Sequence, residues 1–348
     1  MAKIPVIIIT GFLGAGKTTL LNHLINSDHG MKIAVLVNDF GSINIDAELI
    51  VGVEGEDTIN LANGCICCTI RGDLHQAALR ICQRVDRPDY IIIETSGVSD
   101  PLGVAQTFLY TDLANYTAVD TILTLVDAAE FLNLPAENEV LAMDQVGTAD
   151  IVVLNKTDLV DETGLATVRQ AINEISPGAR IFETSYGEVP LPLLFGQGAF
   201  DTLRLQGREV HDVHVHEGAV AHSHAADHGL VFDTCRYESE QPFSLDAIQT
   251  AVDQLPVTVY RAKGMVYLTE SPEKRHILQV VGKRASISQG EAWGTQPPAT
   301  RIVLIGSANG VDEAEITAVF ERSLQQSQSE PSPLGTAVDW VRSLFGAK

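Results

Sequence analysis

Residues 4–18 read IPVIIITGFLGAGKT, an apolar and largely β-branched run that passes directly into a glycine-rich segment. An unbroken run of this kind predicts a strand buried on both faces of a parallel sheet. The following segment satisfies G-x-x-x-x-G-K-[ST], and residues 17–26 have helical spacing. A strand, a glycine-rich turn and a helix in this order predict a phosphate-binding P-loop.

The residues of this loop have separate tasks in holding phosphate. Glycines let backbone N–H groups point inward, and the helix N-terminus adds a partial positive charge. We expect Lys17 to contact the β- and γ-phosphates and the Thr18 hydroxyl to bind Mg²⁺. The residues expected to contact nucleotide here are Gly11, Gly14, Ala15, Gly16, Lys17, Thr18 and Thr19.

Further apolar runs alternate with segments of helical spacing over the next 160 residues or so, which predicts a doubly wound α/β domain with a mostly parallel sheet. The predicted strands are 32–37, 90–94, 121–126, 151–154 and 180–182, and two of the predicted helices are 73–85 and 163–175.

The segment Asn155-Lys156-Thr157-Asp158 follows the predicted strand 151–154, at a sheet edge where open α/β folds bind ligands. A carboxylate such as Asp158 can accept from the N1–H and exocyclic amine of guanine, whereas adenine lacks that pair of donors. We therefore expect Asn155, Lys156 and Asp158 to bind the base of GTP. The same preference argues against a small-molecule kinase, since most kinases of this architecture use ATP.

Two segments after strands are candidate switches that respond to the γ-phosphate. Glu94, in Glu94-Thr95-Ser96-Gly97, can hold Mg²⁺ through water, and Gly97 lets the chain approach the phosphate. In the Asn38-Asp39-Phe40-Gly41 segment, Asp39 or the later Asp46 is a candidate for binding Mg²⁺ or positioning water. We take Lys17, Asp39 and Glu94 as the candidate catalytic residues.

Three of the five cysteines, Cys65, Cys67 and Cys68, fall within four positions. Thiolates bind Zn²⁺, Co²⁺ or Cu(I) far better than Mg²⁺ or Ca²⁺, so this cluster predicts a transition-metal site with a fourth position open for exchange. Cys82 and Cys235 are interpreted as small core residues on a helix and a strand.

The second half of the chain predicts a different, α+β domain. Strands are expected at 230–237, 257–260, 264–268, 277–281 and 301–305, with helices at 244–254 and 312–323. We divide the chain into residues 1–204, a His-rich linker at 205–229, the second domain at 230–325 and a mobile tail at 326–348 in which a short helix is an open alternative. The linker histidines, expected to collect metal ions, are His211, His214, His216, His222, His224 and His228.

A formal net charge of -22 argues against nucleic acid or an anionic membrane as partner, because their phosphates would repel the surface. Beyond the first strand and P-loop, no apolar run approaches the ~20 residues that span a bilayer. The clustered cysteines suit a reducing compartment, and we expect a cytoplasmic protein.

The motifs GFLGAGKTT, NDFG, NGCICC, ETSG and NKTD together resemble those of the CobW-like GTPases, relatives of HypB and UreG. Further likeness lies around residues 261–264 and 281–284. The resemblance implies a SIMIBI-class P-loop GTPase domain followed by a smaller CobW C-terminal domain, with low intrinsic GTPase activity. This sequence departs from the family pattern at Asp39, where Glu is usual, and at Ser42, where an acidic residue is common.

The resemblance implies a metallochaperone that couples GTP hydrolysis to delivery of Zn²⁺ to a client metalloprotein. Assembly of the chain as a homodimer is an open alternative. Two alternatives also remain open at this point. One is a cobalt chaperone for cobalamin biosynthesis, and the other is a metal storage or sensor protein in which GTP acts as an allosteric ligand.

Overall fold

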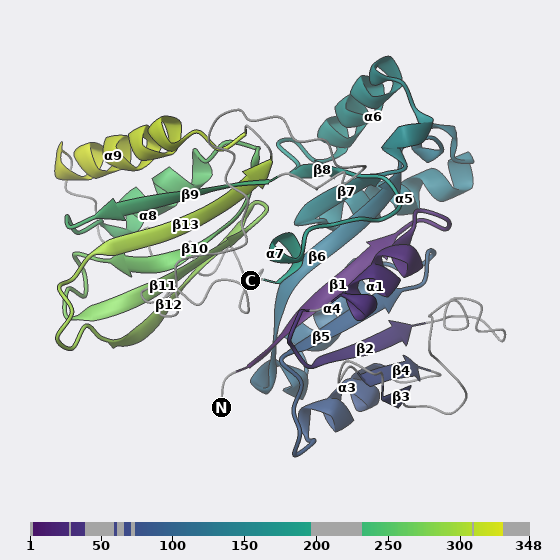
Figure 1. Cartoon of the computed structure of the whole chain (residues 1–348), viewed down its shortest axis with the longest axis horizontal. Helices are drawn as coiled ribbons and strands as arrows, with labels where there is room; N and C mark the ends of the chain where they lie inside the picture. Colours follow the sequence, from purple (N-terminus) through teal and green to yellow (C-terminus); the bar gives the residue numbers. More distant parts are fainter. Residues whose placement is uncertain are drawn as a thin grey trace, which may run out of the picture. The chain divides into compact units, whose positions relative to one another are not determined.

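The computed structural model describes residues 3–27, 29–38, 59–60, 66–70, 74–195, 232–307 and 310–329 (Figure 1). The chain divides into two compact units. The first consists of Met1–Leu194 together with Leu255–Tyr260 and Val280–Ala285, and the second consists of Phe195–Gln254, Arg261–Gln279 and Ser286–Lys348.

The first unit is built on an eight-stranded sheet in the order β3-β4-β2-β5-β1-β6-β7-β8, and β1 runs between β5 and β6 (Figure 1). All neighbouring pairs are parallel except β3 with β4. The strands are β1 Ile4–Gly11, β2 Ile33–Asn38, β3 Ile59–Asn60, β4 Ile66–Ile70, β5 Tyr90–Thr95, β6 Thr117–Asp127, β7 Ile151–Asn155 and β8 Ile181–Glu183. The predicted doubly wound, mostly parallel sheet is confirmed.

Every residue of β1 and β5 is buried, as their unbroken apolar sequences predict for central strands. Because the neighbours are parallel, the carboxyl ends of β1, β5, β6 and β7 meet at one edge of the sheet. Gly11, Thr95, Asp127 and Asn155 end these four strands. That edge therefore gathers the polar and glycine-rich segments named in the sequence.

The helices of this unit are α1 Lys17–Asn26, α3 Leu74–Cys82, α4 Pro101–Leu109, α5 Ala136–Thr148, α6 Glu162–Ile175 and α7 Leu191–Leu194, with short 3₁₀ turns η1 Asp112–Asn115, η2 Phe131–Asn133 and η3 Thr157–Leu159. Side chains of α3 and α4 pack with β1, β2 and β5 in one core cluster, and residues of α5 and α6 pack with β6 and β7 in another. These clusters fix the sheet edge from which the loops project.

The starts of the helices differ in a way that matters for ligands. Asp100 caps α4 by accepting from Leu102 N at 2.8 Å, and Asp161 caps α6 by accepting from Gly164 N at 2.8 Å. Helix α1 has no side-chain cap, and its N-cap residue Gly16 is left-handed with φ 102°. The first amides of α1 are thus open to an external anion, whereas α4 and α6 each begin with a capping carboxylate.

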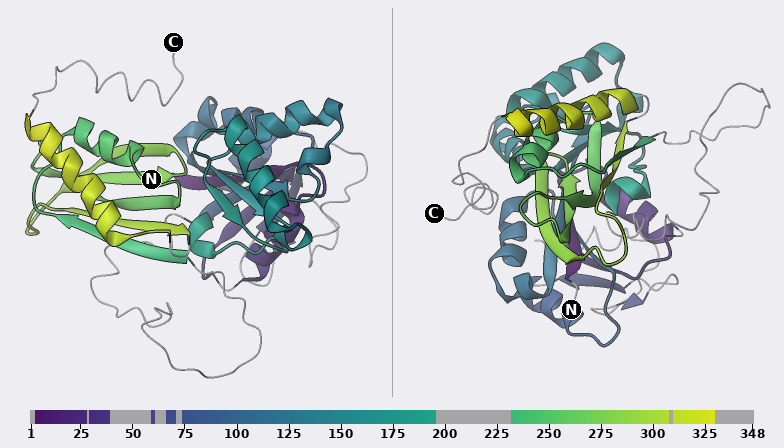
Figure 2. Two further views of the ribbon diagram at one scale, coloured as in Figure 1. Left: turned by 90° about the horizontal axis from the view of Figure 1, so that it is seen from above. Right: turned by 90° about the vertical axis from the view of Figure 1, so that its left-hand side faces the viewer.

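The second unit contains a five-stranded sheet in the order β12-β11-β10-β13-β9. Helices α8 and α9 lie side by side against it (Figures 1 and 2), and Tyr237 of β9 stacks on Phe320 of α9 with ring centroids 4.4 Å apart. The elements are β9 Phe232–Ser239, α8 Leu245–Asp253, β10 Val259–Tyr267, β11 Lys274–Val281, β12 Arg284–Ala292, β13 Thr300–Ser307 and α9 Glu313–Ser329. The predicted α+β class is confirmed.

Two features of this sheet differ from the sequence prediction. The two strands predicted at 257–260 and 264–268 merge into the single strand β10, Val259–Tyr267. Gly264 permits the close approach of its neighbour, because a Cβ built there would lie 2.0 Å from the carbonyl oxygen of Arg301. Strand β12 was not predicted, because its sequence is polar and it is an edge strand with mostly exposed side chains. Helix α9 also extends to Ser329, beyond the helix end predicted at 323.

No helix in the described part of the chain is both long and apolar enough to cross a membrane.

Candidate functional site

The P-loop of this chain closes tightly on the sheet. Gly11, Gly14 and Gly16 have φ values of 136°, 78° and 102°, which only glycine adopts readily. A Cβ at Gly11 would lie 2.2 Å from the carbonyl oxygen of Leu125, and one at Gly16 would lie 2.3 Å from the Asn155 amide nitrogen. Gly11 and Gly16 are therefore required by the close approach of β6 and of Asn155, respectively.

Replacing Gly11 with alanine should lower the free energy of unfolding by roughly 2–5 kcal/mol, because backbone strain and a clash with the β6 backbone act together. Gly14→Ala is the matched control: its φ is also positive, but nothing lies within 4 Å of the new Cβ. We expect that control to cost only about 1 kcal/mol. Urea unfolding without nucleotide measures both variants, and equal losses would contradict the packing argument.

Lys17, Thr18 and Glu94 meet at the mouth of the loop. The buried Lys17 ammonium donates to the carbonyl oxygens of Gly11 at 2.9 Å and Phe12 at 3.2 Å. The Thr18 hydroxyl donates to Oε1 of Glu94 at 2.7 Å, and Glu94 is only 1% exposed. A hydroxyl and a buried carboxylate at this separation form the hard oxygen donor set that Mg²⁺ prefers, so these two residues fit that ion.

The turn after β5 is fixed by hydrogen bonds from Gln145 of α5. The buried Gln145 amide donates to the carbonyl oxygens of Gly97 at 3.2 Å and Ser99 at 3.1 Å. Gly97 also abuts the P-loop, since a Cβ there would lie 2.7 Å from the Leu13 backbone nitrogen. Gln145 is not predictable as a site residue, because nothing in its local sequence pattern distinguishes it from a helix-surface residue.

Asn155 joins three loops of the site. Its side chain is buried, donating to the carbonyl oxygen of Ala15 at 2.8 Å and accepting from Gly187 N at 2.9 Å. One amide thus ties the P-loop to the loop after β8. We predicted a contact with the base for Asn155, and the structure places its side chain in this structural bridge.

Lys156 and Asp158 are presented on either side of Thr157. Lys156 has a left-handed backbone with φ 62°, and its ammonium lies 2.6 Å from Asp127 Oδ2 at the end of β6. Asp158 is exposed, and its backbone nitrogen donates to the Ser185 hydroxyl at 3.3 Å. Asp127 and the loop 184–187 were not predicted; the polar ends of β6 and β8 were the signals available.

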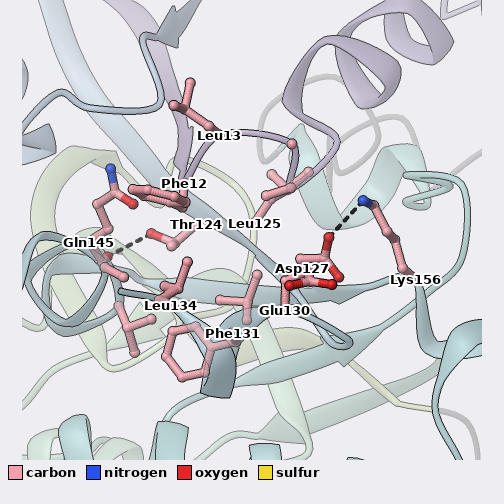
Figure 3. Close-up of a pocket in the computed structure, with 15 residues that line it drawn as sticks. Phe12, Leu13, Thr124, Leu125, Asp127, Glu130, Phe131, Leu134, Gln145 and Lys156 are labelled. Carbon is pink, nitrogen blue, oxygen red and sulfur yellow. Dashed lines mark hydrogen bonds and ion pairs between the residues drawn. The ribbon is translucent and has the colours of Figure 1, made fainter. Parts of the chain in front are cut away.

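A cavity of about 330 Å³ lies beside the P-loop (Figure 3). Phe12 and Leu13 of the loop line it with Phe131 and Leu134, and Asp127 and Glu130 supply carboxylates. Its walls are thus largely apolar and its acidic groups would repel phosphate. The expected phosphate contacts, Lys17 and Thr18, are not among the residues that line this cavity.

The cysteine motif enters the same sheet. The backbone of β4 carries Cys67 and Cys68 and pairs with β2, placing Leu36 opposite Cys68 and Val37 opposite Thr69. Strand β2 pairs in turn with β5, where Val37 is opposite Glu94. The cysteine pattern predicts a metal-binding cluster and does not indicate strand β4, which the structure adds.

The remaining two cysteines are core residues, as predicted. Cys82 and Cys235 are free, and their exposed fractions are 4% and 6%. Burial raises the pKa of both thiols, which disfavours the metal-binding thiolate. Within the described residues, no group of three or more histidine, cysteine and acidic side chains is placed to hold a metal ion.

Several predicted site residues lie outside the described residues. They are Asp39, Asp46, Cys65 and the linker histidines His211, His214, His216, His222, His224 and His228. Thr19, also predicted to contact nucleotide, is exposed in the first turn of α1. Their roles stay predictions.

A P-loop and an Asn-Lys-Thr-Asp segment at one edge of a doubly wound sheet define a P-loop GTPase. The particular family follows from comparison with known proteins. Residues 5–183 match the family described as CobW/HypB/UreG, nucleotide-binding domain, and residues 232–324 match the cobalamin synthesis protein cobW C-terminal domain. The chain belongs to this family.

Similar proteins cover nearly the whole chain. A zinc chaperone CobW from Sinorhizobium sp is 33% identical over 346 residues, covering 91% of this chain and 96% of that protein. A zinc chaperone CobW from Pseudomonas aeruginosa is 36% identical over 355 residues, with 93% and 92% covered. The crystal structure of Zn(II)-bound YjiA GTPase from E. coli is 28% identical, with 92% and 99% covered and a TM-score of 0.48.

Proposed function

We propose that this chain hydrolyses GTP and uses the cycle to pass zinc to a client metalloprotein. The observation that carries the proposal is the register of three strands. Glu94, whose carboxylate accepts from Thr18, lies opposite Val37 of β2, and Val37 lies opposite Thr69 of β4, next to Cys68. Adjacent strands are about 4.8 Å apart, so the backbone of the cysteine motif is about 10 Å from that of Glu94.

The nucleotide half of the cycle uses residues at the mouth of the P-loop. Lys17 and the uncapped amides of α1 neutralise the phosphates of GTP, and Asp158 accepts from the guanine edge. Thr18 and Glu94 would hold Mg²⁺, which would supply charge neutralisation at the phosphates. Asp39, in the other predicted switch, is the candidate for positioning water.

Zinc enters as the cargo of the cycle. The relatives named zinc chaperones support Zn²⁺ as the metal. Three thiolates from Cys65, Cys67 and Cys68 leave one position of a tetrahedral site for a ligand that exchanges with the client. The six linker histidines provide imidazoles that can collect the ion beforehand.

Coupling between the halves follows from their shared sheet. Glu94 contacts Thr18, a candidate Mg²⁺ ligand beside the γ-phosphate, and a change at this contact would reach β4 through the paired backbones of β5 and β2. Loss of that phosphate is thus expected to alter the geometry of the cysteine motif. Allosteric coupling of this kind typically changes affinity about 5- to 150-fold.

Competitive Zn²⁺ titration of the reduced protein, with Mg²⁺ and either GDP or a non-hydrolysable GTP analogue, tests this proposal. We expect the two nucleotide states to differ in zinc affinity by at least about fivefold. Replacing Cys65, Cys67 and Cys68 by serine should abolish tight binding in both states. Cys82→Ala is the matched control, since that thiol is buried in the core.

Equal zinc affinity in the two states would refute the coupling and favour metal storage or sensing. Tighter binding of Co²⁺ than Zn²⁺ under the same conditions would indicate cobalt as cargo instead. Removing residues 209–228 tests the histidines separately: zinc stoichiometry should fall while GTP turnover is unchanged, and an unchanged stoichiometry would exclude a collecting role.

A further inference from the structure

The loop that follows β8, residues 184–187, is fastened to the Asn155–Asp158 segment. Thr157 N donates to the carbonyl oxygen of Thr184 at 3.2 Å, and the Thr157 and Ser185 hydroxyls lie 3.1 Å apart. The same Ser185 hydroxyl accepts from Asp158 N at 3.3 Å. The first half of the loop is therefore held against the segment that carries Asp158.

The second half of the loop is fixed by Gly187. Its amide donates to Asn155 Oδ1 at 2.9 Å, and a Cβ there would lie 3.0 Å from Leu20 N in α1. Tyr186 is thus the one residue between two anchored neighbours. Its position is determined by the bonds of Ser185 and Gly187 to the nucleotide-site segments.

Tyr186 is costly to the fold in its observed conformation. Its φ is 57°, and among the described residues only it and Lys156 are left-handed without being glycine. For a residue with a bulky side chain this backbone conformation is a genuine outlier. It costs about 1–3 kcal/mol of stability, and residues strained in this way cluster at functional sites. Tyr186 is also 69% exposed, so core packing does not compensate for the strain.

We propose that the Tyr186 ring stacks on the purine of the bound guanine nucleotide. The inference rests on the assignment of Asp158 to the guanine edge, because an edge contact leaves the faces of the base open. Ser185 links the Asp158 backbone to the residue next to it, so the ring is presented beside the base. Asp158 then selects guanine, and Tyr186 adds affinity with little choice among purines.

Three variants of the full-length chain test the proposal by calorimetric binding of GDP and ADP in Mg²⁺. Tyr186→Gly removes the ring and also relieves the strained φ, so the folded protein should be at least as resistant to urea as the wild type. It should nevertheless raise the Kd for GDP about tenfold, as expected for loss of one aromatic stacking partner. Tyr186→Phe keeps the ring and should stay within twofold. Tyr110→Ala is the matched control, because Tyr110 is 67% exposed at the end of α4.

Unchanged GDP affinity in Tyr186→Gly would overturn the proposal, as would equal losses in the Gly and Phe variants, which would assign the effect to the hydroxyl. A different outcome would refute the assignment of Asp158 to the guanine edge: wild-type protein that binds ADP as tightly as GDP. Since stacking is insensitive to the kind of purine, the comparison at Tyr186 can still be made then with either diphosphate.

Discussion

Replacement of Lys17 by alanine should lower kcat for GTP hydrolysis about 10²- to 10³-fold. The ammonium is buried in the P-loop, 2.9 Å from the Gly11 carbonyl oxygen, where it can follow charge that develops on the phosphates. Removing one preorganised charge-stabilising group from an enzyme site has an effect of this size. Phosphate release under single-turnover conditions measures it even when the wild type is slow.

The matched control is Lys32→Ala. Lys32 is an exposed lysine that pairs with Asp86 on the surface, and its loss should leave turnover within twofold. Turnover of Lys17→Ala within threefold of the wild type would show that this lysine does not stabilise the transferred phosphoryl group. Circular dichroism of both variants establishes that each is folded.

The second large effect is expected for Asp158→Asn, which should change the preferred base from guanine to xanthine. The carboxylate accepts two N–H groups from guanine, whereas an amide offers one acceptor and one donor. Xanthine has a carbonyl in place of the exocyclic amine, so it complements the amide. We expect the affinity for GDP to fall about 10²-fold or more and xanthosine diphosphate to bind more tightly than GDP.

Asp161→Asn is the control for this change. Asp161 lies three residues away and caps α6 through Gly164 N, a bond that asparagine also makes. Its nucleotide preference should remain that of the wild type. A persistent preference for GDP in Asp158→Asn would mean that another group reads the base.

Much of this site was predictable because its signals are local. A β-branched run followed by glycines and Gly-Lys-Thr specifies a strand, a loop and a helix, and α1 begins and ends where the sequence predicts. Glu94 was predictable because it lies near the end of a buried strand, and the structure brings it to Thr18. These inferences require only the parallel arrangement of the strands.

The other parts of the site depend on contacts that no local pattern encodes. Asn155 is predicted to bind the base, and the sequence does not indicate that its amide also bridges Ala15 and Gly187 across loops far apart in sequence. Asp127 gains a role only because β6 and β7 are neighbours, which places it beside Lys156. The left-handed backbone of Tyr186 cannot be predicted from the presence of a tyrosine in the sequence.

The uncapped N-terminus of α1 offers a way to measure whether nucleotide occupies the P-loop. Helices α4 and α6 are capped by Asp100 and Asp161, whereas the first amides of α1 follow Gly16 without a capping side chain. A bound phosphate would complete that helix, so hydrogen–deuterium exchange at residues 17–19 should slow with nucleotide while the first turn of α6 is unaffected. Exchange at one helix would then track how long product remains bound after each turnover.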